Sequence, residues 1–198
     1  MESLAPGTPT AAASHWSAPV AGGALDALVG VPGSKSLTNR YLVLAALAEG
    51  PGTIRGALAS RDTVLMARAL TQLGATVERA GDDWTVHPLP RDRPSDEPVT
   101  IDCGLAGTVM RFLPPVAALL ARPVHLDGDP EARVRPMAPV LRSLRALGAR
   151  VDDDGRGTLP FTVTGPGRIV GGPVDIDASV SSQFVSGLLL TGARFAEG

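Results

Sequence analysis

Four features are scarce in this chain of 198 residues, and each scarcity argues against a class of protein. A single cysteine, Cys103, excludes an internal disulfide framework and favours a reducing compartment. Aromatic residues make up only 4% of the chain, too few for a surface that stacks single-stranded nucleic acid. No apolar run reaches the roughly 20 residues that span a bilayer, and Glu2 and Pro6 interrupt any signal-peptide pattern. We therefore expect a cytoplasmic protein without a membrane anchor.

Lysine is also scarce, because Lys35 is the only one and the rest of the 18 Lys and Arg residues are arginine. The net charge of −2 gives no electrostatic reason to expect a nucleic acid or an acidic membrane as partner. An ammonium is a compact point charge, whereas a guanidinium is a planar fork, so a single retained lysine indicates a specific need. An arginine-rich codon bias explains the count equally well. The choice between these two explanations depends on the surrounding residues. Residues 32–40 are predicted to form a polar turn that leads into an apolar helix.

The sequence contains an internal repeat. Residues 141–151 match residues 67–77 at an offset of 74, with Arg, Leu, Leu, Gly, Ala and Val coinciding, and Arg61 and Arg135 fall in the same register. In both copies the pattern predicts an amphipathic helix that ends at the shared glycine, followed by a strand. A second type of helix, preceded by small polar residues or glycine, is predicted three times at nearly the same period. The pattern therefore predicts an α/β fold built from a repeated strand, turn, helix, strand, helix, strand, strand unit of about 70 residues. The third copy is incomplete at the end of the sequence.

Local patterns add expectations for individual segments. Residues 1–14 are predicted to be a disordered tail, and residues 25–31 a short strand. Asp175 and Asp177 are predicted to lie on one polar face of a strand. The first helix is expected to pack through a face spaced at i, i+4, i+7, i+8 and i+11, which consists of Leu37, Tyr41, Leu44, Ala45 and Ala48.

The three polar turns precede helices, where free backbone N–H groups and the positive end of the helix dipole attract anions. If the repeat gathers the turns at one end of the fold, cations and polar side chains meet there. Such a group suits a polyanionic small molecule with hydroxyl groups. Ordinary helix capping explains each turn when it is taken alone. The residues that the pattern brings together are Lys35, Arg40, Arg111, Arg135, Ser181, Ser182 and Gln183.

Several other signals are weaker than they look. Residues 30–36 do not form a P-loop. That motif requires a glycine directly before the lysine and a different spacing between its glycines. The three histidines are scattered singly, so no metal site is predicted. Residues 152–154 are read as a solvated hairpin turn rather than a metal site. Cys103 has no nearby base in the sequence and is read as a packing residue.

Four motifs in order give the chain a specific resemblance to 5-enolpyruvylshikimate-3-phosphate synthase. They cover about residues 28–198, and the arginine-rich composition resembles actinobacterial members. The motifs are Pro32-Gly33-Ser34-Lys35-Ser36 with Asn39-Arg40, Ala106-Gly107-Thr108 with Met110-Arg111, Gly128-Asp129-Pro130 with Arg135-Pro136, and Ser181-Ser182-Gln183-Phe184.

The resemblance implies a fold of two domains, each an inside-out barrel of three βαβαββ units. It implies transfer of the enolpyruvyl group of phosphoenolpyruvate to the 5-hydroxyl of shikimate 3-phosphate, with release of phosphate and without a metal or organic cofactor. Shikimate 3-phosphate would bind to Lys35, Ser36, Arg40, Ser181, Ser182 and Gln183. Phosphoenolpyruvate would bind to Lys35, Gly107, Arg135 and Gln183, with Arg111 in support.

Three departures from the family pattern bear on these expectations. Leu105 and Phe112 stand where many members carry Asn and Pro, which puts sensitivity to glyphosate in question. The family is more than twice as long as this chain, and its second domain supplies the catalytic Asp and further charged residues. We therefore expect a first-domain fragment, with an entry segment at 15–33 that partly belongs to the other domain and an incomplete substrate domain at 34–198. The full-length protein is expected to be monomeric.

Two alternatives stay open at this point. UDP-N-acetylglucosamine enolpyruvyl transferase shares the implied fold, although the Lys35-Ser36 and Ser181-Ser182-Gln183 patterns favour the shikimate enzyme. A non-catalytic anion-binding domain is the second alternative. An RNA-end-processing enzyme with related repeats is disfavoured by the net charge.

Overall fold

The computed structural model describes residues 17–91 and 97–198, which fall into two units, Met1–Val31 and Pro32–Gly198. The predicted tail at 1–14 lies outside the described residues. The described part of the first unit forms no helix or strand. The strand predicted at 25–31 is therefore wrong. A strand is stable only when it pairs with a neighbour, and this segment belongs to neither sheet.

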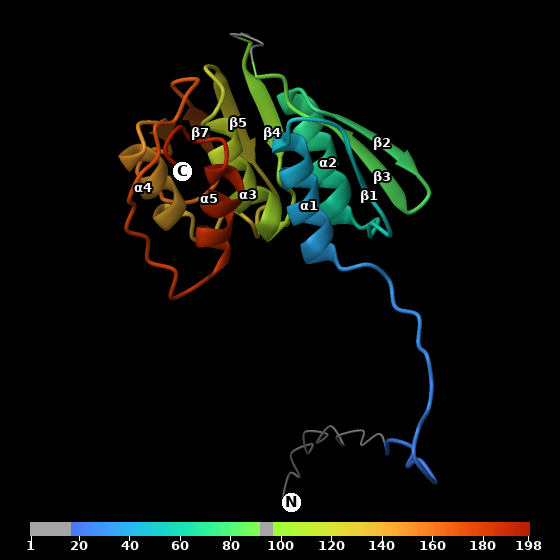
Figure 1. The fold of residues 1–198 in the computed structure, drawn as a ribbon. Helices are drawn as coiled ribbons and strands as arrows, with labels where there is room; N and C mark the ends of the chain where they lie inside the picture. Colours follow the sequence, from blue (N-terminus) through green and yellow to red (C-terminus); the bar gives the residue numbers. More distant parts are fainter. Residues whose placement is uncertain (1–16, 92–96) are drawn as a thin grey trace, which may run out of the picture. The chain divides into compact units, whose positions relative to one another are not determined.

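The second unit contains all the regular elements of the described chain (Figure 1). Its helices are α1 (Lys35–Leu47), α2 (Arg61–Leu73), α3 (Gly107–Ala117), α4 (Ala138–Ala146) and α5 (Gln183–Gly192). Its strands are β1 (Gly52–Ile54), β2 (Thr76–Ala80), β3 (Asp83–His87), β4 (Val99–Asp102), β5 (Pro123–Asp127), β6 (Arg150–Asp152) and β7 (Phe161–Thr164).

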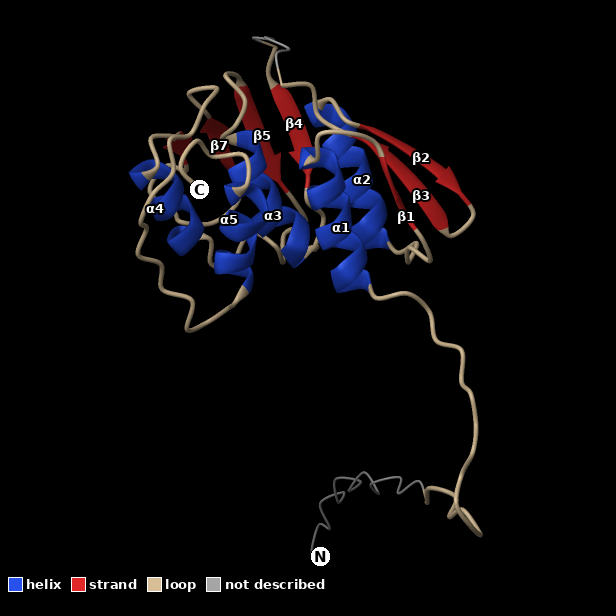
Figure 2. Ribbon diagram, viewed as in Figure 1, coloured by secondary structure: helices blue, strands red, loops and turns tan. Residues whose placement is uncertain are grey.

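The strands form two separate sheets, and the helices lie on one side of them (Figure 2). The first sheet has the order β1-β3-β2 and is antiparallel throughout. The second has the order β4-β5-β7-β6, in which only the β4–β5 pair is parallel. The described strands therefore do not close into a single barrel.

The repeat predicted from the sequence is visible in the order of elements. β4 to β7 with α3 and α4 make one complete βαβαββ unit; α1 to β3 repeats it without the first strand, and α5 begins a third copy. Hydrogen bonds repeat as well: Ala75 N–H donates to the Leu70 carbonyl at 3.0 Å, and Ala149 N–H to the Leu144 carbonyl at 2.9 Å. These pairs differ by the same offset of 74 residues. A glycine with positive φ follows each helix: Gly74 (+115°) is the C-cap of α2, and Gly148 (+91°) comes directly after Leu147, the C-cap of α4.

The first helix turns a different face to the core from the one predicted. Leu37, Tyr41 and Leu44 are 51%, 50% and 44% exposed. The buried face consists of Thr38, Asn39, Leu42, Val43, Ala46 and Leu47. Hydrophobic periodicity does not predict this face, because two of its residues, Thr38 and Asn39, are polar. They are buried because they form hydrogen bonds with residues far away in the sequence.

The predicted strand containing Asp175 and Asp177 is also absent, although the burial of residues 174–177 alternates as it would in a strand. Ile176 is half-buried and both aspartates are exposed. Asp177 instead accepts a hydrogen bond from Ser179 N–H at 3.0 Å, which shapes a local turn. The alternation matches the buried and exposed sides of this segment, but it pairs with none of the strands in the described parts of the chain.

Helix α3 lies at the centre of the unit, and every residue after Gly107 in it is buried. It contains Pro114 and Pro115, and Pro115 has no N–H to donate to the carbonyl of Arg111 one turn earlier. Helix α5 approaches α3 closely beside this carbonyl. A Cβ added to Gly187 of α5 would collide with the Arg111 carbonyl oxygen. The absence of a side chain at Gly187 therefore sets the closest approach of α5 to α3.

We expect Gly187→Ala to lower the free energy of unfolding by about 1 to 3 kcal/mol, because a methyl group there must push the two backbones apart. Gly192→Ala is the matched control on the same helix, since a Cβ there meets nothing within 4 Å. Urea unfolding of both variants measures the difference. Equal stability of the two would contradict this account of the α3–α5 contact.

The acidic segment after β6 is only partly the solvated turn that was predicted. Asp152 and Asp154 are exposed, but Asp153 is buried. Its carboxylate accepts hydrogen bonds from Arg145 at 2.6 Å and from the backbone N–H groups of Gly155 and Gly157 at 3.2 and 2.8 Å. Burial alone would raise the pKa of Asp153, but these bonds outweigh it and hold the pKa below its usual value.

Replacing Asp153 with Asn is expected to lower the free energy of unfolding at pH 7 by about 1 to 3 kcal/mol. A depressed carboxyl pKa stabilises the fold above the unfolded-state pKa of about 3.9, and this contribution is lost as the pH falls through the lower folded-state value. The stability difference between wild type and Asp153→Asn should therefore shrink below about pH 4. Chemical denaturation at several pH values tests this, and a difference that does not vary with pH would contradict it.

Candidate anion-binding site

Three helices begin at one end of the second unit, and the starts of α1 and α5 are visible along the lower edge of Figure 2. Helix α1 is capped by the Ser34 hydroxyl, which accepts a hydrogen bond from Leu37 N–H at 3.3 Å. The residues that precede α3 and α5, Ala106 and Ser182, make no side-chain capping bond. The N–H groups at the start of α3 are thus left without a side-chain cap, as an anion site requires.

Lys35 is the first residue of α1, and its ammonium nitrogen lies 3.0 Å from Oδ2 of Asp62 in the first turn of α2. The Lys35 side chain is 52% exposed, so the ion pair itself contributes little to stability. An ammonium has three donors. The pair with Asp62 therefore holds the head group in place while other donors stay available to a ligand.

The guanidinium groups of Arg111 and Arg135 both lie close to Gly107. A Cβ built on Gly107 would lie 2.6 Å from Nη2 of Arg135 and 3.0 Å from Nη1 of Arg111. Arg135 donates to the carbonyl of Leu105 at 3.0 Å. Across residues 17–91 and 97–198, neither guanidinium forms a salt bridge. Two cations without a carboxylate partner beside a free helix N-terminus make a strongly anion-attracting site.

Arg111 is buried, and burial together with the neighbouring Arg135 lowers its pKa to about 10. It therefore remains protonated at neutral pH. Its Nη1 donates to Oε1 of Gln183 at 2.9 Å, and its guanidinium lies over the ring of Phe184 at 5.1 Å. Arg111 thus fixes the first residue of α5 beside the first turn of α3.

Arg40 joins the starts of α1 and α5. Its guanidinium donates to the Ser36 carbonyl at 3.1 Å and to the Ser186 hydroxyl at 3.4 Å, and it lies 5.1 Å from the ring centroid of Phe112. Ser181 accepts a hydrogen bond from Gln183 N–H at 3.3 Å, and Ser182 is exposed. The contacts of Lys35, Arg40, Arg111 and Arg135 place the predicted polar turns around one region.

Two carboxylates in this region were not predicted as site residues. Asp62 pairs with Lys35, and Asp129 pairs with Arg61 at 2.8 Å. An acidic residue in the first turn of a helix is favourable for the helix dipole alone, so Asp62 gave no separate signal. Asp129 lies within one of the motifs, and its N–H donates to the Gly104 carbonyl at 3.0 Å. Asp62 and Asp129 thus form ion pairs with Lys35 and Arg61, and not with Arg111 or Arg135.

The remaining candidates from the sequence do not form a second site. Cys103 is fully buried in the core, which confirms it as a packing residue, and burial, then the charges of Asp102 and Asp127, raise the pKa of its thiol far above the usual value. His87 lies 3.7 Å from Glu78, and His125 lies 3.2 Å from the Thr162 hydroxyl. His15 lies outside the described residues. The described parts of the chain hold no group of three His, Cys, Asp or Glu side chains arranged for a metal ion.

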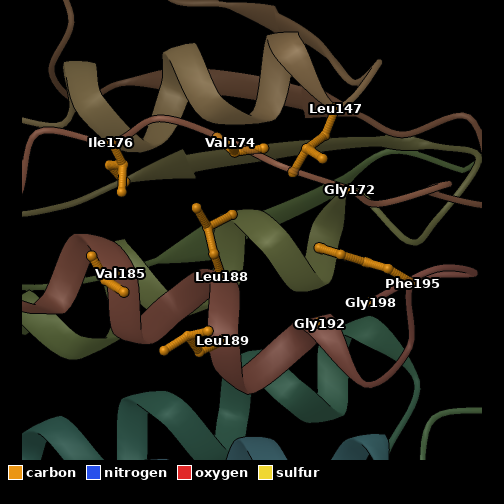
Figure 3. Close-up of a pocket in the computed structure, with 10 residues that line it drawn as sticks. All are labelled: Leu147, Gly172, Val174, Ile176, Val185, Leu188, Leu189, Gly192, Phe195 and Gly198. Carbon is orange, nitrogen blue, oxygen red and sulfur yellow. The ribbon is translucent and has the colours of Figure 1, made fainter.

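A groove of about 370 Å³ lies between α5 and the segment that precedes it (Figure 3). It is lined by Leu147, Gly172, Val174, Ile176, Val185, Leu188, Leu189, Gly192, Phe195 and Gly198. None of these residues has a polar or charged side chain, so the groove offers a phosphorylated ligand no cationic or hydroxyl side chain. The candidate site is therefore the open cationic region at the helix N-termini and not this groove.

The fold is that of an α/β repeat protein, and its candidate anion-binding site lies at helix N-termini. The same architecture occurs in solved enolpyruvyl transferases. The structure of EPSP synthase from Acinetobacter baumannii superposes with a TM-score of 0.73 at 28% identity, over 84% of this chain and 38% of that one. The enolpyruvyl transferase NikO from Streptomyces tendae, at 21% identity, shares the fold with a TM-score of 0.59, over 81% and 36% of the two chains.

The sequence model of EPSP synthase (3-phosphoshikimate 1-carboxyvinyltransferase) matches residues 20–198, and the chain belongs to this family. The 3-phosphoshikimate 1-carboxyvinyltransferases of Kocuria rhizophila and Mycobacterium ulcerans are each 57% identical to it over 187 residues. These alignments cover 91% and 92% of this chain but 42% of each relative. The family resemblance found in the sequence is thus confirmed, and the chain spans less than half the length of these relatives.

Proposed function

We propose that this chain supplies one wall of the active site of a 3-phosphoshikimate 1-carboxyvinyltransferase. The enzyme transfers the enolpyruvyl group of phosphoenolpyruvate to the 5-hydroxyl of shikimate 3-phosphate and releases phosphate. The observation that carries the proposal is the position of two guanidinium groups, Arg111 and Arg135, against Gly107 at the start of α3, where neither forms an ion pair with another described residue. Family membership and the names of the relatives support it.

The contacts suit the division of residues between two anionic substrates. Shikimate 3-phosphate binds to Lys35, Ser36, Arg40, Ser181, Ser182 and Gln183 in this proposal. Phosphoenolpyruvate binds to Lys35, Gly107, Arg135 and Gln183, and Arg111 holds Gln183 in place through the bond of 2.9 Å. Cations here offset the repulsion between two phosphorylated molecules and hold the hydroxyl against the enolpyruvyl carbon. No metal or organic cofactor takes part, and the compartment is the cytoplasm.

The proposal extends to the domain organisation, with residues 34–198 as an incomplete substrate domain. Helix α2 contacts α1 and α3, and α4 contacts α3 and α5, but no described helix occupies the corresponding place between α5 and α1. Both helices also expose apolar side chains, which are Leu37, Tyr41 and Leu44 on α1 and Leu189, 73% exposed, on α5. Further family sequence, including the catalytic residues of the second domain, would cover them and close the site.

None of the helices in the described parts of the chain has the length and apolar character that crossing a bilayer requires. The proposed partners are the two small substrates, and neither nucleic acid nor a membrane is among them. The full-length protein is proposed to act as a monomer.

A chimera tests the function directly. This chain would replace the matching portion of the Kocuria rhizophila relative, which supplies the rest of the family length. We expect phosphate release that requires both phosphoenolpyruvate and shikimate 3-phosphate. Absence of turnover in a folded chimera would refute the proposal, and turnover with UDP-N-acetylglucosamine in place of shikimate 3-phosphate would assign the chain to the other enolpyruvyl transferase. The 198-residue chain alone is expected not to support growth of a strain that lacks the enzyme on medium without aromatic amino acids.

A further inference from the structure

Asn39 is a fully buried amide on α1, one turn after Lys35 and next to Arg40. Its Nδ2 donates to the hydroxyl of Thr108 at 2.6 Å. Thr108 is also buried, and it directly follows Gly107 at the start of α3. This hydrogen bond joins the two helices that carry Lys35 and Gly107, two of the four proposed phosphoenolpyruvate ligands.

Packing alone does not explain an asparagine at this position. A buried amide must be hydrogen-bonded to offset the loss of water, and an apolar residue of similar size would avoid that cost. Here the cost is only half offset, because Oδ1 of Asn39 is buried without a hydrogen-bond partner among the described residues. A second orphaned group, Nε of Arg111, lies one turn after Thr108 on the same helix. Polar groups kept at such expense occur mainly where a fold serves a function.

The geometry points to Asn39 as a positioning residue that sets the distance between the start of α1 and the start of α3. We propose that the Asn39–Thr108 hydrogen bond holds Lys35 and Gly107 at the separation that phosphoenolpyruvate needs. A hydrogen bond has a narrow range of length and angle, whereas an apolar pair in the same space permits sliding. Asn39 touches no substrate in this proposal and acts through Thr108. The inference rests on the proposed function for its substrate but not for the coupling of the two helices.

The test uses variants that separate stability from position. Thr108→Val removes the hydroxyl at constant shape, and the double variant Asn39→Leu/Thr108→Val replaces both partners by apolar groups. Replacing both partners can be nearly neutral for stability. Thr108→Ser keeps the hydroxyl and should rescue. Thr191→Val is the matched control, because Thr191 is also buried but its hydroxyl bonds within α5, to the carbonyl of Gly187 at 3.1 Å.

In the chimera described above, we expect the double variant to melt near the wild-type temperature while its KM for phosphoenolpyruvate rises at least tenfold. Thr108→Ser and Thr191→Val should stay within about twofold of wild type. A double variant with wild-type stability and wild-type KM would overturn the inference.

A second measurement on the 198-residue chain needs no substrate. Hydrogen exchange of the Thr38 and Met110 amides, which bond to the Ser34 and Ala106 carbonyls in the first turns of α1 and α3, reports on the coupling. We expect both to exchange at least tenfold faster in the double variant, with Thr191→Val unchanged. Unchanged exchange would overturn the inference. If the chimera is inactive but exchange rises as expected, the proposed function fails and the coupling stands.

Discussion

Exchanging Lys35 for arginine should abolish most activity although it keeps the charge. In the chimera we expect turnover to fall by about 100-fold or more, because a misplacement near 1 Å at a reacting centre costs that much. The ammonium of Lys35, at the start of α1, is a compact group that lies 3.0 Å from the carboxylate of Asp62 in α2. A guanidinium is wider and planar, and it would pair with Asp62 through its fork. It could then not present a single donor to both substrates.

Stability and activity should separate in this variant. The Lys35–Asp62 pair is exposed on the lysine side, and exposed pairs contribute about 0 to 1 kcal/mol. The melting temperature of Lys35→Arg should therefore stay close to that of wild type. Arg68→Lys, a change between the same residue types at an exposed position of α2, should leave both turnover and melting temperature unchanged. Near-normal turnover of Lys35→Arg would show that the position needs only a positive charge.

The repeat in the sequence predicted the architecture well, because its signals are local. The helix ends at Gly74 and Gly148 depend on a positive φ that glycine adopts readily, and the structure has both. The order of elements from β4 to β7 follows the predicted unit completely. The strand at 25–31 failed because pairing is not local: an apolar segment becomes a strand only beside another strand.

The candidate site was predictable only in part. The polar turns and their cations could be read from the sequence, and the helix starts indeed carry Lys35, Gly107 and Gln183. The partner residues Asp62 and Thr108 could not be predicted from the sequence. Their roles depend on contacts between different helices and not on residue spacing within one helix. The same holds for the buried face of α1. Asn39 is polar and interrupts the hydrophobic pattern, and only its bond to Thr108 explains why it lies inside.

Gly107 is the position where a single methyl group should change substrate binding without harming the fold. A Cβ there would lie 2.6 and 3.1 Å from the two terminal nitrogens of Arg135, so the guanidinium must move and its bond to the Leu105 carbonyl is strained or lost. These atoms are the ends of flexible side chains. Alanine is also favoured over glycine in a helix by about 0.5 to 1 kcal/mol. We therefore expect the free energy of unfolding of Gly107→Ala to stay within about 1 kcal/mol of wild type.

The kinetics of the chimera should change strongly in Gly107→Ala, although its stability does not. We expect the KM for phosphoenolpyruvate to rise by about 10- to 100-fold in Gly107→Ala, because one cation is displaced and the methyl group occupies the space over the free N–H groups of α3. The KM for shikimate 3-phosphate should change much less, since its proposed ligands lie on α1 and at the start of α5 or just before it. Gly192→Ala adds the same methyl group at a helical position where a Cβ meets nothing within 4 Å, and it serves as the control. Equal losses for both substrates would place Gly107 in a general structural role, whereas a selective loss for phosphoenolpyruvate assigns the start of α3 to that substrate.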